Sequence, residues 1–389
     1  MPRNCFLIVA GERSGDVYGA ALAQALKARM ADAEIFGCGG EAMRAAGVET
    51  IVDIHQVALI GISEVVSGLP KAYLALRGLV AEAARRKPAT AILIDSPSLN
   101  LSLAKRLKQR GIPVIYFVSP QIWAWKKWRI RKIKACVDRM LCLFDFETEI
   151  YEKADVPVEC VGHPLVDMTA PGHTREEFFS GADLDPNVTT VALLPGSRKT
   201  EVTFNAPAML GAADRVAQSR PIQFVVASAP TIDSAWLRSL VSRSYESKAP
   251  LRVLGNSTHE ALQYSDATVV ASGTATIEAA LRECPMIVVY RVSAFTAMCA
   301  RVMIDVPFYS MVNLLAGHGA VPELIQGDFT PARLADALKR LLDDAEARDK
   351  MVADLRIVKR RLGKGGAIGR AADAIVHHLE GTKASLRAE

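Results

Sequence analysis

Short apolar runs alternate with amphipathic helical patterns along the first part of the chain, and this alternation constrains the fold more than any other feature. CFLIVAG (5–11) precedes VYGAALAQALKARM (17–30), AEIFGCG (33–39) precedes EAMRAAG (41–47), and TAILIDS (90–96) precedes LNLSLAKRLKQRG (99–111). Strands that are apolar throughout and alternate with helices form a parallel sheet with helices on both faces. The sequence therefore predicts an α/β fold.

A second series of the same kind has apolar runs at 189–197, 222–228, 251–255, 267–273 and 285–291. A chain of 389 residues is too long for one hydrophobic core, and the segment between the two series (169–187) is rich in turn formers. We expect two Rossmann-like domains, at 1–170 and 185–345, with a helix at about 360–389 packing back on the first. Ligands of such sheets bind at the carboxyl ends of the strands, here in the central cleft that the two halves would face.

Composition excludes several classes of protein. Half of the residues are apolar, as in a compact globule, and the net charge of +5 favours local anionic partners over a nucleic-acid coat. The seven cysteines are scattered without a CxxC pair, which indicates buried thiols in a reducing cytoplasm rather than a disulfide framework or a zinc site. His377 and His378 have no carboxylate or cysteine at ligand spacing, so no metal is expected. No segment reaches the roughly 18 apolar residues of a spanning helix, which predicts a cytoplasmic protein that can still sit on a membrane surface.

Polar residues follow two apolar runs of the first half. VAGERSGDVYG (9–19) places Gly11, Ser14 and Asp16 at a strand-to-helix turn, where a plain tight turn and an anion-binding substrate loop are equally supported. AILIDSPSLN (91–100) ends a strand in Asp95, which suits either a general base facing the cleft or a cap on the helix that begins near Leu99. The glycines of GCGGEAM (37–43) formally match a dinucleotide-binding pattern, but alone this pattern is a weak indication of an NAD site.

In the second half, VALLPGSRKTEV (191–202) ends a strand in Gly196 and Ser197 and opens a helix at Arg198. Helix-terminal amides beside a guanidinium suit a diphosphate, because the helix dipole favours negative charge and arginine binds phosphate oxygens in pairs.

VVASGTATIEAAL (269–281) repeats this arrangement, with Gly273, Thr274 and Ala275 at a helix start and Glu278 one turn later. An acid at that position can accept hydrogen bonds from both ribose hydroxyls, although Thr274 and Glu278 also fit ordinary helix capping. Two phosphate-competent helix starts in one half favour nucleotide binding.

The stretch SPQIWAWKKWRIRKIKAC (119–136) joins three tryptophans to six cations. Trp123 and Trp125 lie close to a strand end and are expected to line the cleft. A helix over 126–137 exposes Trp128 beside Lys126 and Arg129, as in a contact with lipid headgroups, with a plainly solvated helix face as the alternative. Its opposite face is an ordinary core stripe made of Ile130, Ile133 and Val137.

Eleven segments occur in the order and spacing of one known family: AGERSGD, GCGGEAM, GISEVVSGLP, IDSPSLN, VSPQIWAWKKWRIRKI, FDFE, VGHPLVD, LLPGSRKTEV, SGTATIEAAL, CPMIVVYR and VPELIQ. Over about residues 6–326 the chain resembles the lipid-A-disaccharide synthases. The resemblance implies an inverting glycosyltransferase of the GT-B type that uses neither a metal nor a cofactor. It implies transfer of 2,3-diacylglucosamine from UDP-2,3-diacylglucosamine to 2,3-diacylglucosamine 1-phosphate, which forms a β(1→6) disaccharide and UDP. It further implies peripheral association with inner-membrane lipids, and it leaves open a homo-oligomer.

The resemblance also implies roles for single residues. Asp95 matches the strand-end Asp that deprotonates or orients the attacking 6-hydroxyl, and Arg198 matches the arginine that neutralises the departing diphosphate. The implied UDP contacts are Gly196, Ser197, Gly273, Thr274, Ala275, Glu278, Asn313 and Gln326. The implied acceptor and lipid side contains Gly11, Ser14, Asp16, Trp123 and Trp125.

The chain departs from the family pattern at Ser98, where a second Asp is common, and at Asp145, where Pro is common. Since Asp95 is retained, we expect it to be the base. Two other functions are open from the sequence: a UDP-N-acetylglucosamine 2-epimerase with the same fold, and a basic, Trp-rich protein that binds membranes or RNA without catalysis. A second basic patch and a known RNA-binding motif are both missing from the sequence, so no nucleic-acid partner is expected.

Overall fold

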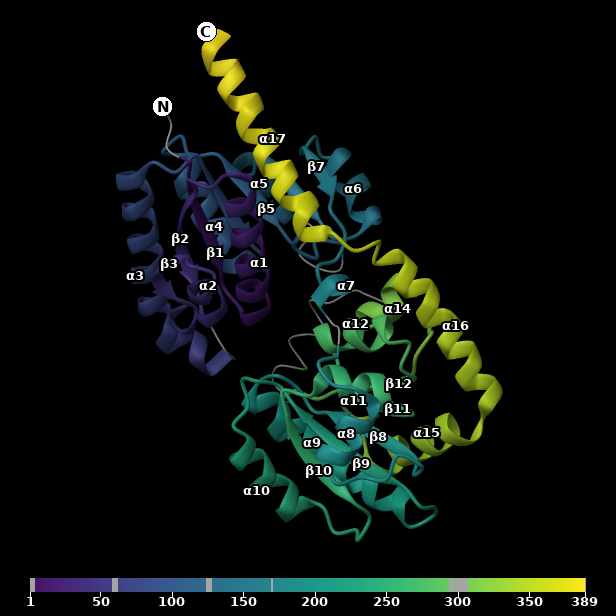
Figure 1. Ribbon diagram of the computed structural model, residues 1–389. Helices are drawn as coiled ribbons and strands as arrows, with labels where there is room; N and C mark the ends of the chain where they lie inside the picture. The colour runs from purple at the N-terminus through teal and green to yellow at the C-terminus, as the bar shows by residue number, and fades with distance from the viewer. Residues whose placement is uncertain are drawn as a thin grey trace. The chain divides into compact units, whose positions relative to one another are not determined.

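The computed structural model describes residues 4–57, 62–123, 128–168, 171–293, 297 and 307–388. The chain divides into two compact units, which are described separately. The first consists of Met1–Pro164 and Leu362–Glu389, and the second of Leu165–Arg361. The C-terminal helix, drawn in yellow in Figure 1, therefore belongs with the purple and blue elements of the first unit.

The first unit is built on a seven-stranded parallel sheet in the order β3-β2-β1-β4-β5-β6-β7. Its strands are β1 (Cys5–Ala10), β2 (Glu34–Gly39), β3 (Glu49–Asp53), β4 (Thr90–Ile94), β5 (Val114–Phe117), β6 (Arg139–Cys142) and β7 (Val158–Cys160). Its helices are α1 (Arg13–Arg29), α2 (Glu41–Ala45), η1 (Ile54–Gln56), α3 (Ile62–Arg86), α4 (Pro97–Lys108), α5 (Arg129–Cys136), α6 (Asp145–Glu152) and α17 (Ala367–Ala388).

The second unit holds a six-stranded parallel sheet in the order β10-β9-β8-β11-β12-β13. Its strands are β8 (Thr190–Leu194), β9 (Gln223–Ser228), β10 (Leu251–Gly255), β11 (Ala267–Ala271), β12 (Met286–Tyr290) and β13 (Glu323–Ile325). Its helices are α7 (Leu165–Met168), α8 (Arg175–Gly181), α9 (Lys199–Ala217), α10 (Ser234–Ser244), α11 (Thr258–Tyr264), α12 (Thr274–Leu281), α14 (Met311–Ala316), α15 (Pro331–Asp343) and α16 (Ala345–Arg361).

Both sheets confirm the predicted α/β class. Every residue of β1, β4, β5, β8, β9 and β11 is buried, which explains why these segments are apolar throughout rather than alternating. When the strands of each unit are numbered from its first strand, β1–β6 and β8–β13 both have the order 3-2-1-4-5-6, and β7 extends the first sheet. This order is the doubly wound Rossmann arrangement.

The C-terminal helix α17 packs on the first unit through specific contacts. Arg29 of α1 pairs with Asp373 at 2.6 Å and donates a second hydrogen bond to the Gly369 carbonyl. Arg370 donates to the Val161 carbonyl beyond β7 at 2.9 Å. Within the described ranges, no helix is long and apolar enough to cross a bilayer.

Candidate active site

Each sheet has a point where the order of its strands reverses, and the predicted site residues gather at these two points. In the first unit β1 and β4 are neighbours in the sheet, with Ala10 opposite Ile94. The chain continues from β1 to β2 on one side of this pair and from β4 to β5 on the other side. In the second unit β8 pairs with β11, with Leu194 opposite Val270. Ligands of doubly wound sheets bind outside the carboxyl ends of the strands at such a reversal. Within each unit, the fold thus brings together two motifs that lie more than 70 residues apart in sequence.

Asp95 follows β4 in a strained turn. Asp95 and Ser96 both have a positive φ, of +48° and +44°, which is unfavourable for residues with a Cβ. Gly11, at the end of the neighbouring β1, makes room for this turn, because a Cβ at Gly11 would lie 2.4 Å from the Ser96 hydroxyl oxygen. Strained positions of this kind cluster at functional sites, where surrounding structure maintains them.

The carboxyl group of Asp95 is suited to accept a proton. Burial, together with the nearby Glu12 carboxylate, raises its pKa to about 6, and the Ser96 N–H acts in the opposite direction. The Asp95 carbonyl, in contrast, is held firmly by the Asn100 side chain at 2.8 Å and by the Tyr116 hydroxyl. Ser96, not Asp95, is the N-cap residue of α4, so the alternative of Asp95 as a helix cap is not supported.

Asp16 lies in the first turn of α1 and is nearly fully buried. Its carboxylate accepts hydrogen bonds from the backbone N–H groups of Gly40, Ala42 and Met43, at 2.6, 3.0 and 3.2 Å. These contacts fix the start of α2, so the structure shows Asp16 positioning the turn after β2. Ser14 is half-buried in the same turn of α1, and a direct acceptor contact by either residue stays a prediction.

Glu12 was not identified from the sequence. It is exposed as the N-cap residue of α1, next to Gly11, and its charge acts on Asp95 across the β1–β4 pair. The first unit therefore presents two carboxylates at its reversal point. Glu12 stands inside the quoted motif GERSGD, but only the pairing of β1 with β4 shows that it lies near Asp95.

Gly196, Ser197 and Arg198 lie between β8 and α9, where two backbone N–H groups just before the helix are occupied by a side chain of the protein. Glu201 accepts from the N–H groups of Ser197 and Arg198, at 3.1 and 3.3 Å, and pairs with the Arg198 guanidinium at 3.5 Å. Gly196 has φ +134°, and a Cβ there would lie 2.7 Å from Cβ of Glu201. Glu201, which sequence reasoning did not select, holds Arg198 at the point where a diphosphate was predicted.

The start of α12 is open. Its N-cap residue Gly273 makes no side-chain cap hydrogen bond, and the first turn, with Thr274 and Ala275, contains no acid. Gly273 has φ +158°, and a Cβ added at this position would have no neighbouring atom within 4 Å. Glu278 is half-buried one turn along, where burial raises the pKa of its carboxyl to about 7 and Arg282 acts in the opposite direction. A free helix N-terminus with a desolvated acid one turn away suits a phosphate beside a pair of hydroxyls.

Asn313 and Gln326 are held by the backbone of the second unit. The Asn313 amide is buried and bonds to both backbone polar groups of Val321 and to Glu323, at 2.8–2.9 Å. Gln326 has φ +53°, and its side-chain amide, in the orientation that satisfies both groups, bonds to the N–H and C=O of Val292 at 3.2 and 3.3 Å. These bonds use the side-chain atoms that a nucleotide would need, so the structure gives both residues a loop-shaping role, and nucleotide contact by either stays a prediction.

The tryptophan stretch is described in part. Trp123 is half-buried, donates to Glu147 at 3.3 Å and makes an edge contact with Phe146 at 5.3 Å. Burial raises the pKa of the Glu147 carboxyl to about 7, and hydrogen bonds from Ser119, Phe144, Trp123 and Leu143 act in the opposite direction. Trp125 and Lys126 lie outside the described residues.

The helix that follows corrects one prediction. Trp128 is 64% exposed, as expected, and Ile133 and Val137 are buried in the core. Arg129, however, is 6% exposed and lies near Tyr116, so it cannot touch a membrane surface. Its place is set by helical periodicity, because Arg129 stands four residues before Ile133 and shares its inward face. The expectation of Arg129 as a headgroup contact was wrong for this reason.

The two departures from the family pattern are both at helix starts. Ser98 is exposed in the first turn of α4, and Asp145 is the exposed first residue of α6. Asp95 is thus the carboxylate that the turn after β4 retains. Among the residues with described placement, no group of three His, Cys, Asp or Glu side chains is arranged to hold a metal ion.

Comparison with known proteins identifies the family. A family model described as lipid-A-disaccharide synthetase matches residues 5–369. The lipid-A-disaccharide synthase of Myxococcus xanthus is 44% identical over 376 residues, which cover 96% of this chain and 97% of that protein. The chain belongs to the lipid-A-disaccharide synthase family. It is therefore a glycosyltransferase, of a family that acts on sugar nucleotides and lipid-linked substrates.

Solved structures with little sequence similarity share the fold of this lipid-A-disaccharide synthase family member. One is a putative UDP-N-acetylglucosamine 2-epimerase from Listeria monocytogenes, with a TM-score of 0.64, 13% identity and coverage of 97% of both chains. Another is the calicheamicin glycosyltransferase CalG4, with a TM-score of 0.62, 14% identity and coverage of 98% of this chain and 100% of that chain. At such low identity these likenesses show the GT-B type fold and leave the reaction to the family match.

Proposed function

We propose that the protein transfers 2,3-diacylglucosamine from UDP-2,3-diacylglucosamine to the 6-hydroxyl of 2,3-diacylglucosamine 1-phosphate. The products are UDP and the β(1→6)-linked disaccharide from which lipid A is made. The family match over residues 5–369 carries this assignment. The first unit, with Asp95, would take the acceptor, and the second unit, with the α9 and α12 helix starts, would take the sugar nucleotide.

Asp95 is proposed as the general base. Its oxygen would accept the proton of the 6-hydroxyl as that oxygen attacks the anomeric carbon of the donor, which inverts the configuration there. A pKa of about 6 leaves the carboxyl ionised at neutral pH while keeping it more basic than an ordinary aspartate. The strained turn holds this carboxyl in a fixed direction, and Glu12 helps to keep its proton affinity high.

Arg198 and the start of α12 are proposed to stabilise the leaving group. As the bond between the anomeric carbon and the diphosphate oxygen breaks, negative charge grows on UDP. A guanidinium held by Glu201 and an uncapped helix N-terminus are preorganised for that charge, so they stabilise the transition state more than the ground state. Glu278 would accept hydrogen bonds from the ribose hydroxyls, and no divalent metal is proposed.

The protein is further proposed to work at the cytoplasmic face of the inner membrane, because both substrates carry acyl chains. The exposed Trp128 supports this, since an indole ring is stable at the boundary between headgroups and acyl chains. Assembly with further copies of the chain is left to measurement.

The deciding experiment incubates the purified protein with both lipid substrates in detergent and measures UDP release with and without the acceptor. The proposal expects UDP release that depends on the acceptor, together with a disaccharide identified by mass spectrometry. Release of UDP without the acceptor, or an epimerised sugar nucleotide, would instead point to epimerase chemistry. Asp95→Asn and Arg198→Ala test the site in the same assay.

A further inference from the structure

A positively charged depression lies between α4 and α5 of the first unit, away from the strand ends described above. It has a volume of about 290 Å³ and is lined by Ser102, Lys105, Arg106, Gln109 and Lys132. A second depression of about 460 Å³ shares Lys105, Gln109 and Lys132 and adds Lys108, Ala135 and Cys136. We call the two together the α4–α5 groove. Its lining contains no acidic residue.

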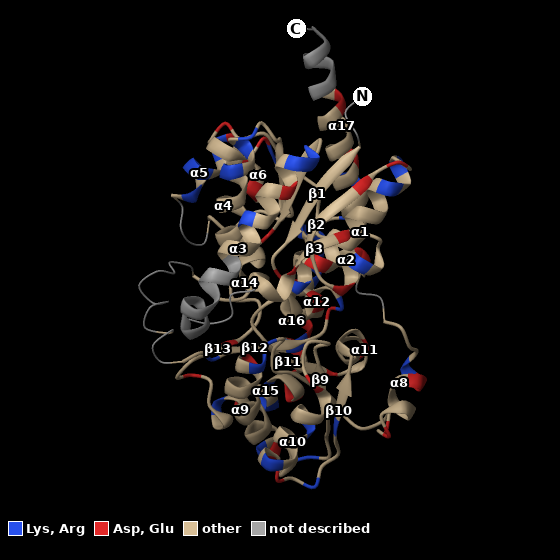
Figure 2. Ribbon diagram, turned by 90° about the vertical axis from the view of Figure 1, so that its left-hand side faces the viewer, with Lys and Arg blue, Asp and Glu red and all other residues tan. Residues whose placement is uncertain are grey.

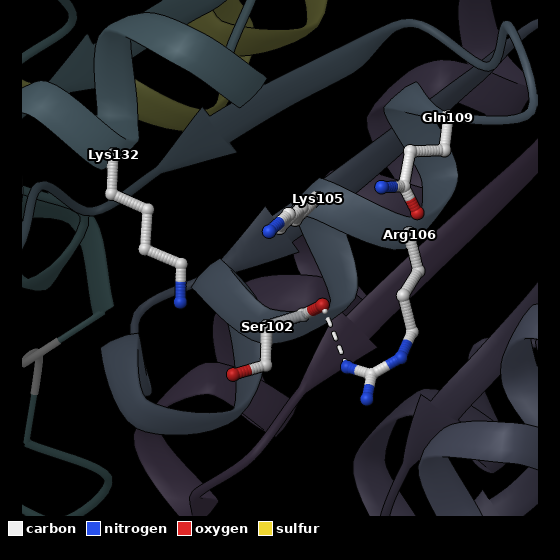
Figure 3. A pocket seen from close by; sticks show the side chains of 5 residues that line it. All are labelled: Ser102, Lys105, Arg106, Gln109 and Lys132. Atoms are coloured by element: carbon white, nitrogen blue, oxygen red, sulfur yellow. Dashed lines mark hydrogen bonds between the residues drawn. The ribbon is translucent and has the colours of Figure 1, made fainter.

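The groove is assembled by tertiary structure. Figure 2 shows blue Lys and Arg segments on the neighbouring helices α4 and α5, and in Figure 3 the ammonium groups of Lys105 and Lys132 point toward the same space. Arg106 donates to the Ser102 carbonyl at 3.0 Å, so its guanidinium lies along α4 beside Ser102. Lys132 lies 26 or more residues after Ser102, Lys105 and Arg106 in the sequence.

The groove has an excess of positive charge without matching acids. Lys108 pairs with Asp138, but in the described part of the chain no ion pair involves Lys105, Arg106 or Lys132. The charges also act at one place: burial raises the pKa of the Cys136 thiol in the groove and the Asp138 carboxylate raises it further, while Lys132, Lys108 and Lys105 act in the opposite direction. Cations that outnumber the neighbouring acid repel one another, so an anionic ligand would stabilise the arrangement.

Ordinary helix electrostatics explains the cations that α4 contributes to the groove but not the one from α5. Lys105, Arg106 and Lys108 lie in the last turn of α4, where the helix dipole favours cations. Lys132 does not fit this explanation. It belongs to α5, whose first turn contains no acid and begins with arginine and lysine, against the preference of the dipole. The cations at the start of α5 therefore need another reason.

Trp128 indicates which anion fits. It precedes α5 with helical φ and ψ of −60° and −19°, so it lies one turn before Lys132 on the same side of the helix. It is 64% exposed, and the groove beside it is partly open to solvent rather than enclosed. A shallow open site binds a free anion weakly, whereas a membrane presents many anions at once together with an apolar layer for the indole.

We propose that the α4–α5 groove binds the headgroup phosphate of an anionic phospholipid while Trp128 inserts beside it. The inference rests on the membrane association in the proposed function and adds the class of lipid and the residues that select it. It is independent of sugar transfer, because vesicle binding is measured without either substrate. A failure of the transferase assay would thus leave this inference standing, and the reverse also holds.

The test measures sedimentation of the full-length protein with vesicles of phosphatidylcholine alone and with phosphatidylglycerol added. The groove variant is Lys105→Gln with Lys132→Gln. Its matched control is Arg85→Gln with Lys153→Gln, which removes the same charge from exposed positions on α3 and just after α6 of the same unit. Trp128→Ala is the third variant, and UDP binding is measured in each to show that the second unit is intact.

We expect the groove variant to bind phosphatidylglycerol vesicles about thirty-fold more weakly, since each lysine near an anionic surface contributes roughly a five-fold factor. The control is expected to change binding less than about two-fold, because these two cations do not line the groove and exposed charges are screened by salt. Trp128→Ala should weaken binding to the same vesicles. Equal losses in the groove and control variants would overturn the proposal in favour of general charge attraction. Suppression of vesicle binding by millimolar inorganic phosphate at constant ionic strength would overturn it in favour of a site for free phosphate.

Discussion

Two aspartates at the same edge of the first sheet, Asp16, which is buried, and Asp95, which is half-buried, should respond in opposite ways to the same substitution. Asp95→Asn and Asp16→Asn each replace a carboxylate by an amide of nearly equal size. The Asp16 carboxylate accepts three backbone N–H groups, whereas the Asp95 carboxyl is desolvated next to Glu12. The Asp16 side chain therefore stabilises the fold through these hydrogen bonds, whereas the desolvated Asp95 carboxylate destabilises it.

The magnitudes follow from these surroundings. A rise in the pKa of Asp95 from 3.8 to about 6 corresponds to a loss of at most about 3 kcal/mol of unfolding free energy at pH 7. Asp95→Asn removes this loss, so the variant should be more stable than the parent by up to that amount. Asp16→Asn turns an NH₂ group toward N–H donors and should cost about 2–3 kcal/mol, the range for hydrogen bonds to a charged group.

The effect of Asp95 has a defined pH dependence. Because its pKa is higher in the folded state than in the unfolded state, the folded state binds more protons between about pH 4 and pH 6. Proton uptake by Asp95 therefore stabilises the folded parent protein at low pH, and this stabilisation is lost as the pH rises through that window. The Asn variant has no such pH-dependent stabilisation. The advantage of Asp95→Asn should thus be near zero at pH 4 and complete above about pH 6.

Urea unfolding followed by tryptophan fluorescence measures both effects in the first unit, which contains three of the four tryptophans. The same Asp95→Asn protein should lose about 10²–10⁴-fold in kcat, as expected for a general base. A variant that is less stable than the parent at pH 7, or a gain that is the same at pH 4 and pH 7, would refute the account of Asp95 as a desolvated carboxyl.

Three further predictions test the sugar-nucleotide site of the second unit and the metal independence of the reaction. Arg198→Ala should lower kcat by about 10²–10³-fold through loss of a donor to the growing charge, while Arg215→Ala at the far end of the same helix should leave the rate unchanged in the same UDP-release assay. Calorimetric titration with UDP should show weaker binding below about pH 7 as the Glu278 carboxyl protonates. Glu278→Gln should bind UDP weakly at every pH. If the variant keeps the pH dependence of the parent, Glu278 is not the group responsible for it. Turnover should survive excess EDTA, and loss of activity that added magnesium restores would contradict a metal-independent reaction.

The strands and many of the predicted site positions could be found from the sequence because their signals are local. Apolar runs of strand length and turn-forming residues after them specify where each strand ends, and Asp95, Ser197 and Thr274 all follow such runs. Asn313 was harder, because its side chain bonds to Val321 and Glu323 in a loop with no regular pattern. The inward face of Arg129 was within reach of the sequence, since it keeps helical spacing with Ile133.

The sequence by itself determined that this chain alternates strands with helices and carries polar turns at strand ends, because periodicity and turn chemistry act over a few neighbouring residues. Only the tertiary structure decided which turns meet. It paired β1 with β4, which put Glu12 near Asp95, and packed α4 beside α5, which gathered Lys105 and Lys132 into one groove. Strand order and helix packing depend on how distant segments bury their apolar faces together, and no local pattern contains that information.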